Sequence, residues 1–221
     1  MALLSVRSLG IAFGGVKALH DVSFDVRAGE IFSIIGPNGA GKTTLLNVTT
    51  GIYTGANGDI LLDGAGIKLL SPQQRAARGI QRTFQNLQTF RSMTALENVL
   101  VGLHLQQKTG FLAALAGLPS VAAETREATD RAMQLLEELG LGAVADQQAD
   151  TLSYGMQKRL EIARALAAQP RLLLLDEPAA GLNGAETAEI SRVISDVARK
   201  HTTVVLVEHD MKMVMSVSDR I

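Results

Sequence analysis

The chain has 221 residues, of which 47% are hydrophobic and 19% are charged, with a formal net charge of −1 and no cysteine. This length is enough for one globular domain with a sizeable core and an inserted subdomain. The near-neutral charge gives no reason to expect nucleic acid as the main partner. A chain without cysteine cannot form disulfides or thiolate metal sites.

The N-terminus and the hydropathy of the chain exclude two kinds of segment. The stretch MALLSVRSLG lacks the charged region and the long apolar core of a signal peptide. No apolar run approaches the roughly 20 residues that a membrane-spanning helix needs. We therefore expect a cytoplasmic chain whose link to a membrane is made by a partner.

In chain order, the first clear strand pattern is the apolar run EIFSIIG at residues 30–36, which ends in glycine. A helix is expected to begin near Lys42, and GDILLDG at residues 58–64 predicts a short strand between turn residues. Within residues 92–140, ALENVLVGLHL and ETREATDRAMQLLEELG are amphipathic helical patterns without a strand between them. The simplest interpretation is an inserted helical subdomain, with an Ala- and Gly-rich link at residues 109–123 of undefined form.

Two continuous apolar runs follow, RLLLLDE at residues 171–177 and TTVVLVEH at residues 202–209. Continuous rather than alternating apolar residues are typical of parallel strands that are covered on both faces. Residues 183–201 between them have apolar residues at helical spacing, which predicts a strand–helix–strand crossover. The two ends of the chain therefore predict an α/β sheet.

A phosphate loop is predicted at residues 36–44, where GPNGAGKTT fits the pattern G-x-x-x-x-G-K-[ST] between a strand and a helix. Glycines let backbone N–H groups wrap around phosphates, because a side chain would block the approach. Lys42 would reach the β- and γ-phosphates, and the Thr43 hydroxyl would bind Mg²⁺. A Gly-rich turn with a chance lysine is the alternative, which the flanking strand and helix disfavour. The residues predicted to bind the nucleotide here are Gly36, Pro37, Asn38, Gly39, Ala40, Gly41, Lys42, Thr43 and Thr44.

Two carboxylates, Asp176 and Glu177, follow four leucines at the end of a predicted buried strand. Ligands of open α/β sheets bind at the carboxyl ends of the strands. Asp176 would hold Mg²⁺ through water, and Glu177 would polarise the attacking water as a general base. Capping of the next turn by both carboxylates is the alternative, and the phosphate loop in the same chain favours the chemical role.

His209 and Gln85 are further polar candidates for this edge of the sheet. His209 ends the run VVLVEHD, where it would make a strand-end hydrogen bond or donate to the γ-phosphate. Gln85 lies in RTFQN before the helical part, where it would meet Mg²⁺ or water, or be a surface amide.

A second anion-binding feature lies in LSYGMQKRLEIARAL at residues 152–166, a predicted helix that opens on Ser153 and Gly155. Backbone N–H groups at such a helix start attract an anion. The phosphate loop, Gln85, LSYGM, LLLLDE, GLN and His209, in this order, resemble the ATP-binding subunits of ABC transporters over the whole chain. In this family two subunits pair head to tail, and each signature helix closes over the ATP of the other, which accounts for the second anion site.

The resemblance implies a fold and a set of roles. The fold is an α/β P-loop NTPase of the ABC ATPase type, with a mainly parallel sheet core, an N-terminal antiparallel β section and an inserted helical subdomain. The core would occupy residues 1–91 and 169–221, and the helical subdomain with the signature would occupy residues 92–168. Phe13 would stack on adenine, although it could equally belong to the core, and Gln85 would link the nucleotide to the membrane subunit.

The site residues that follow from the motifs and the resemblance form three further groups. The catalytic residues would be Glu177, His209 and Lys42. The Mg²⁺ ligands would be Thr43, Gln85 and Asp176. The contacts to the ATP of the partner subunit would come from Ser153, Gly155, Met156 and Asn183.

Several stretches narrow the resemblance to the ATPases of branched-chain amino-acid importers: FGGVKAL, RTFQNLQTFRSMTALENVLVG, EPAAGLN, EHDMKMVMSVSDRI and HLQQKTGF. Such a chain would use ATP and Mg²⁺ at the cytoplasmic face of the inner membrane to import branched-chain or other hydrophobic amino acids. Its partners would be an identical or sister ATPase, two membrane permeases and, indirectly, an external binding protein.

The sequence departs from the family pattern at three places. Met156 stands where Gln is usual, and Gly184 stands where Pro commonly follows GLN, which loosens the start of the next helix. The chain ends at SDRI where relatives continue with further strands and a tail, so we expect a truncated form.

Other function classes are less consistent with the motifs. A soluble ABC-type ATP-gated clamp or regulator is the main alternative, but such proteins usually carry long coiled coils or two cassettes, and neither pattern is visible. A GTPase is disfavoured because the sequence has no N-K-x-D motif, and a P-loop kinase would leave LSYGM unexplained.

Overall fold

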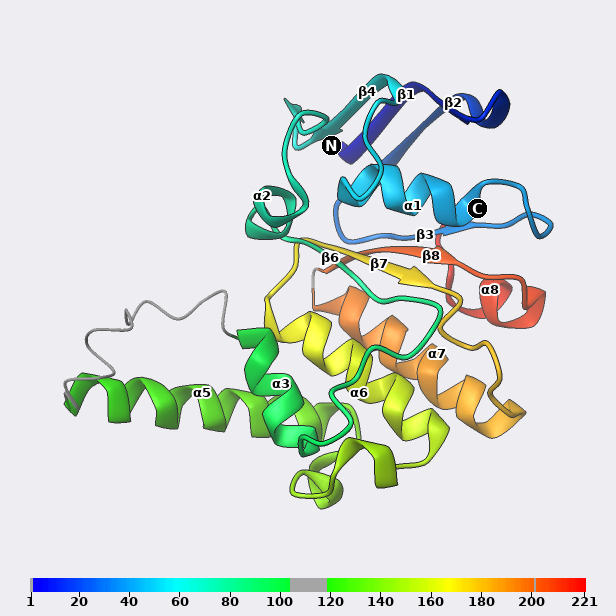
Figure 1. Ribbon diagram of the computed structural model, residues 1–221. Coiled ribbons are helices and arrows are strands. Elements are labelled where there is room, and N and C mark those ends of the chain that lie inside the picture. The colour runs from blue at the N-terminus through cyan, green and yellow to red at the C-terminus, as the bar shows by residue number, and fades with distance from the viewer. Residues whose placement is uncertain (1, 104–118, 201) are drawn as a thin grey trace. The chain divides into compact units, whose positions relative to one another are not determined.

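The structure is a computed structural model that describes residues 2–103, 119–200 and 202–221 (Figure 1). By its contacts the chain divides into two compact units, one formed by Met1–Gln85 with Pro170–Ile221 and the other by Asn86–Gln169. The first unit holds both β-sheets. Among the described helices, none combines the length and the apolar character that crossing a membrane requires.

An antiparallel sheet opens the first unit and confirms the predicted N-terminal β section. Its strand order is β2-β1-β4-β5, with β1 paired antiparallel to both β2 and β4. Val6, Leu9, Val26 and Ile60 from these strands are buried in the core. The strands are β1 (Ala2–Phe13), β2 (Val16–Arg27), β4 (Asn57–Leu62) and β5 (Ala65–Gly66).

A parallel sheet of order β3-β8-β7-β6 forms the second sheet of this unit. Every residue of β7 and β8 is buried, as expected for the continuous apolar runs that predicted these strands. Because neighbouring strands run parallel, their carboxyl ends lie at one edge of the sheet, where ligands of α/β folds bind. The strands are β3 (Ile31–Ile34), β6 (Ile80–Arg82), β7 (Leu172–Asp176) and β8 (Thr203–Val207).

Helices connect the strands of the first unit. Helix α7 follows β7 and precedes β8, which confirms the predicted crossover, and it buries Ile190, Ile194 and Val197 at helical spacing. Helix α1 begins at Lys42, directly after the predicted phosphate loop, as expected. The helices are α1 (Lys42–Thr50), α2 (Pro72–Ala77), α7 (Gly184–Arg199) and α8 (Met211–Val217).

The second unit consists of helices and short turns in its described part, without a β-strand, as predicted. A Cβ on Gly102 would lie 2.2 Å from the carbonyl oxygen of Arg164, so the close approach of α3 to α6 requires glycine. The predicted HLQQKTGF stretch at residues 104–111 and most of the link at residues 109–123 lie outside the described residues. The helices are α3 (Ala95–Leu103), α5 (Pro119–Glu138) and α6 (Tyr154–Ala167), with 3₁₀ turns at Gly142–Val144 and Ala149–Thr151.

Candidate active site

A cavity of about 610 Å³ in the first unit collects most of the predicted site residues. Its size falls in the range of small-molecule sites, about 300–1,000 Å³. The lining comes mainly from the segments that follow β3, β6, β7 and β8, so the parallel sheet positions it. The lining residues are Ala18, Gly36, Pro37, Asn38, Gly39, Gly41, Lys42, Thr43, Thr44, Gln85, Glu177 and His209.

The phosphate loop needs glycine at the position that precedes α1. Gly41 has a φ of 86°, and a Cβ there would lie 2.4 Å from the carbonyl oxygen of Ala18 and 2.9 Å from Leu19 Cδ2. Gly41 is also the N-cap of α1, and no side chain caps the backbone N–H groups of the first turn. A helix start without a capping side chain presents N–H donors and a partial positive charge, which suits a phosphate.

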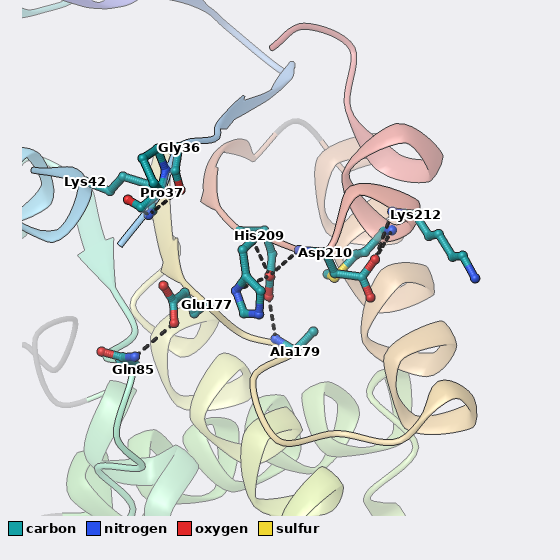
Figure 2. Close-up of polar contacts among 11 residues, drawn as sticks. Gly36, Pro37, Lys42, Gln85, Glu177, Ala179, His209, Asp210 and Lys212 are labelled. Atoms are coloured by element: carbon teal, nitrogen blue, oxygen red, sulfur yellow. Dashed lines mark hydrogen bonds and ion pairs between the residues drawn. The ribbon is translucent and has the colours of Figure 1, made fainter. Parts of the chain in front are cut away.

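Lys42 is buried within the loop that it follows. Its Nζ donates hydrogen bonds to the carbonyl oxygens of Gly36, at 2.8 Å, and Pro37, at 3.0 Å (Figure 2). An ammonium group has three donors, so these two bonds hold the charge at the loop and leave one donor for an anion. The predicted contact of Lys42 with the β- and γ-phosphates stays a prediction.

The two carboxylates after the leucine run differ in their surroundings. Asp176 is 1% exposed, and its Oδ2 accepts a hydrogen bond from Arg82 Nη2 at 2.7 Å. Its Oδ1 is buried and has no hydrogen-bond partner among the described residues. Glu177 lines the cavity, and its Oε2 accepts a hydrogen bond from Gln85 Nε2 at 2.9 Å (Figure 2). Glu177 and Gln85 are therefore bonded directly to each other at the cavity that the phosphate loop lines.

The donor set of this site fits Mg²⁺. Mg²⁺ prefers hard oxygen ligands and is usually held by one or two carboxylates together with phosphate oxygens and water. Thr43 and Gln85 line the cavity and supply a hydroxyl and an amide oxygen, and Asp176, buried outside the lining but next to Glu177 in the chain, supplies a carboxylate. The unpartnered Oδ1 of Asp176 is the specific sign of a fit, because a buried carboxylate oxygen without a donor calls for a cation or its bound water.

His209 lines the same cavity, and the residue before it fixes its loop. Glu208 is 0% exposed; its Oε1 accepts a hydrogen bond from Ala179 N at 2.9 Å, and its Oε2 accepts from His209 N at 2.8 Å and Asp210 N at 3.3 Å. The His209 imidazole is exposed, with Nδ1 3.5 Å from Glu208 Oε2. Glu208 thus ties the segment after β7 to the segment after β8. Glu208 is not among the residues predicted from the sequence, although a glutamate that ends an apolar run is a usable signal.

Replacing Glu208 by Gln is expected to lower the free energy of unfolding by about 1–3 kcal/mol, because the amide has one acceptor oxygen for three backbone donors. Its NH₂ group would also point at an N–H group. Urea unfolding followed by circular dichroism measures the change. Glu97→Gln is the matched control, since Glu97 exchanges capping hydrogen bonds with Thr94 and Gln serves equally well there. Equal urea midpoints for the two variants would contradict this role of Glu208.

Comparison with known proteins identifies the family to which this site belongs. Residues 19–180 match the ABC transporter family. The chain belongs to this family. It is 50% identical over 220 residues to the high-affinity branched-chain amino acid transport ATP-binding protein LivG of Escherichia coli K12, covering 99% of this chain and 86% of LivG.

Solved structures agree with the sequence match. The ADP conformation of MJ1267, an ATP-binding cassette of an ABC transporter, is similar with a TM-score of 0.84 and 33% identity, over 99% of this chain and 85% of that one. A dimeric, post-hydrolysis structure of the cassette MJ0796 bound to ADP and Pi is similar with a TM-score of 0.80 and 26% identity, over 96% and 90% of the two chains. The predicted ABC-type ATPase and its P-loop NTPase fold are therefore confirmed.

Several residues assigned by resemblance to ABC proteins lie outside the cavity lining. Phe13 packs its ring edge-to-face on Tyr53, with 5.1 Å between the ring centroids, and is 45% exposed. Asn183 is the N-cap of α7: its Oδ1 accepts hydrogen bonds from Ala185 N and Glu186 N, and Asn183 N in turn donates to Glu186 Oε2. This capping box was visible in the sequence as N-x-x-E and compensates for the Pro that Gly184 replaces. Contacts of Phe13 with adenine and of Asn183 across subunits stay predictions.

The signature residues of the ABC pattern lie at the start of α6 in the second unit. Ser153 is the N-cap of α6, and its Oγ accepts a hydrogen bond from Met156 N at 3.3 Å. Ser153 is exposed, Gly155 is buried and Met156 is half-buried. An exposed hydroxyl at a helix start can bind an anion of another molecule. The contact of these residues with a partner's nucleotide stays a prediction.

Proposed function

We propose that this chain is the ATP-hydrolysing subunit of an ABC importer for branched-chain or other hydrophobic amino acids, working at the cytoplasmic face of the membrane. The observation that carries the proposal is the cavity that unites the phosphate loop with Gln85, Glu177 and His209. The 50% identity with LivG over nearly the whole chain supports the class of substrate. The amino acid itself would never touch this subunit.

In this proposal the polar residues in and beside the cavity have defined tasks. The loop N–H groups and Lys42 bind the phosphates and orient the γ-phosphate. Mg²⁺, held by Thr43, Gln85 and Asp176, neutralises phosphate charge when bound. Glu177 accepts the proton of the attacking water, and His209 donates a hydrogen bond to the γ-phosphate oxygen.

ATP-dependent dimerisation would convert this chemistry into transport. The signature residues Ser153, Gly155 and Met156, together with Asn183, would complete the site of a second ATPase subunit, identical or sister. The dimeric ADP-bound relative supports such an arrangement. Closure and opening of the dimer would act on two membrane permeases, while an external binding protein would deliver the amino acid.

Purification of the tagged chain from detergent-solubilised membranes of its own host tests this proposal. We expect two permeases to co-purify, and ATP turnover of the complex in liposomes to rise when leucine-loaded binding protein is added inside. A Lys42→Ala chain should co-purify with the same permeases without turnover. A chain that hydrolyses ATP but recovers no permease would favour the soluble clamp or regulator.

A further inference from the structure

Arg82, at the end of β6, joins three parts of the first unit through one buried side chain. Its Nη2 donates to Asp176 Oδ2 at 2.7 Å, and its Nη1 donates to Asn47 Oδ1 at 2.5 Å. The guanidinium carbon lies 5.0 Å from the ring centroid of Phe84, which covers one side of the charge. The Arg82 and Asp176 side chains are 5% and 1% exposed, so the ion pair is almost completely removed from water.

A buried ion pair of this kind is weak evidence for stability. Desolvation of two charges is costly, and an apolar pair of similar volume often serves a fold equally well. The pair also leaves two buried polar atoms, Asp176 Oδ1 and Arg82 Nε, without hydrogen bonds among the described residues. An ion pair with a purely structural role would be expected to have both of these atoms hydrogen-bonded. The incomplete bonding therefore suggests a function for the pair.

The orientation of Asp176 supplies that function. Arg82 binds one carboxylate oxygen and leaves the other, Oδ1, buried and unpartnered. Asn47 lies on α1, the helix that begins at Lys42, so the same guanidinium also fixes the carboxylate relative to the phosphate loop. The planar guanidinium binds the two acceptors through separate nitrogens in a fixed geometry, whereas the ammonium of lysine is a compact point charge on a flexible stem and does not fix their relative directions.

We propose that Arg82 is a positioning residue for the metal site: it holds Asp176 by Oδ2 and so keeps Oδ1 unbonded for the Mg²⁺ that would accompany the nucleotide, or for a water of that ion. This inference rests on the proposed function, because it presumes that ATP binds with its metal beside Asp176. It adds to that function a residue that touches neither nucleotide nor metal. Groups that orient a ligand in this way typically change metal affinity by about 10–100-fold when they are mutated.

The test measures metal binding rather than turnover. Arg82→Lys keeps the charge but loses the fork, and Arg171→Lys is the matched control, since the ion pair of Arg171 with Asp63 is exposed. Mn²⁺ binding to the ATP complex is followed by the electron paramagnetic resonance signal of free Mn²⁺, and ATP affinity is measured separately in EDTA. We expect Arg82→Lys to weaken Mn²⁺ binding by about tenfold and to leave ATP affinity in EDTA within about twofold of the parent, with no change for Arg171→Lys.

A second variant keeps the test decisive if Arg82→Lys does not fold. Asn47→Ala removes one anchor of the guanidinium and retains the ion pair, and we expect it to weaken Mn²⁺ binding by about threefold. If Arg82→Lys folds and its Mn²⁺ affinity equals that of the parent, the proposal is overturned and the ion pair is structural. If Arg82→Lys does not fold, unchanged Mn²⁺ affinity of the Asn47→Ala chain overturns the proposal in the same way. A parent chain that binds no ATP under either condition would instead refute the proposed function.

Discussion

Replacing Glu177 by Gln is expected to lower ATP turnover by about 100-fold or more while leaving ATP affinity within about twofold of the parent value. Glutamine cannot accept the proton of the attacking water. The geometry of the site should survive, because Gln85 Nε2, now 2.9 Å from Glu177 Oε2, can donate equally to an amide oxygen. The backbone of Glu177 is held independently by the hydrogen bond from its N–H group to Val207 O.

Phosphate release measures turnover in this experiment, and equilibrium dialysis measures binding. Glu97→Gln is the control, an exposed glutamate on α3 whose capping role glutamine preserves. With hydrolysis blocked, the Glu177→Gln chain should also shift from monomer to dimer in solution when Mg-ATP is added. Equal turnover of the Glu177→Gln and parent chains would remove Glu177 from the role of general base.

The parts of the fold that could be predicted are those encoded by neighbouring residues. The continuous apolar runs of β7 and β8 predict buried parallel strands, because burial on both faces removes the alternation of polar residues. The phosphate loop is equally local, since its glycines, Lys42 and the helix start follow one another in the chain. The edge of the sheet where Glu177 and His209 meet then follows from parallel strand direction alone.

The positioning residues could not be predicted from local sequence. Arg82 and Asp176 are 94 residues apart, and Ala179 and Glu208 are 29 apart, so their contacts depend on strand order rather than on spacing. A single sequence contains no sign that one arginine pairs with a particular aspartate. The capping box at Asn183 is different, because N-x-x-E is a local pattern that the sequence displays directly, even with Gly184 in place of the usual Pro.

Phe13 illustrates a further limit of local reading. An aromatic residue at the end of a predicted strand can stack on a ligand or pack in the hydrophobic core, and the sequence does not distinguish these two roles. In the structure it packs on Tyr53 and stays 45% exposed. A half-exposed ring can stack on a purine, so adenine stacking stays a prediction.

Mixing two inactive chains should restore ATP turnover if each site of the dimer is built from two subunits. Lys42→Ala alone is expected to lower ATP affinity by about tenfold or more, because it removes a charged hydrogen-bond donor. Ser153→Ala is expected to impair the site of the partner subunit rather than its own. In a mixed dimer, one composite site would therefore carry both lesions and the other site neither.

Equimolar mixing makes half of the dimers mixed, and each mixed dimer has one intact site of two, so turnover should recover to roughly one quarter of the parent value. The matched control is a mixture of Lys42→Ala with Glu177→Gln, whose residues line the same cavity of one chain. Each site of that mixed dimer carries one lesion, and no recovery is expected. If the Lys42→Ala and Ser153→Ala mixture forms dimers by mass but stays inactive, Ser153 acts on the site of its own chain. Recovery in this mixture but not in the control assigns the signature helix to the nucleotide of the partner. If Lys42 and Ser153 of one chain served the same site, each site of the mixed dimer would carry one lesion and neither would be intact.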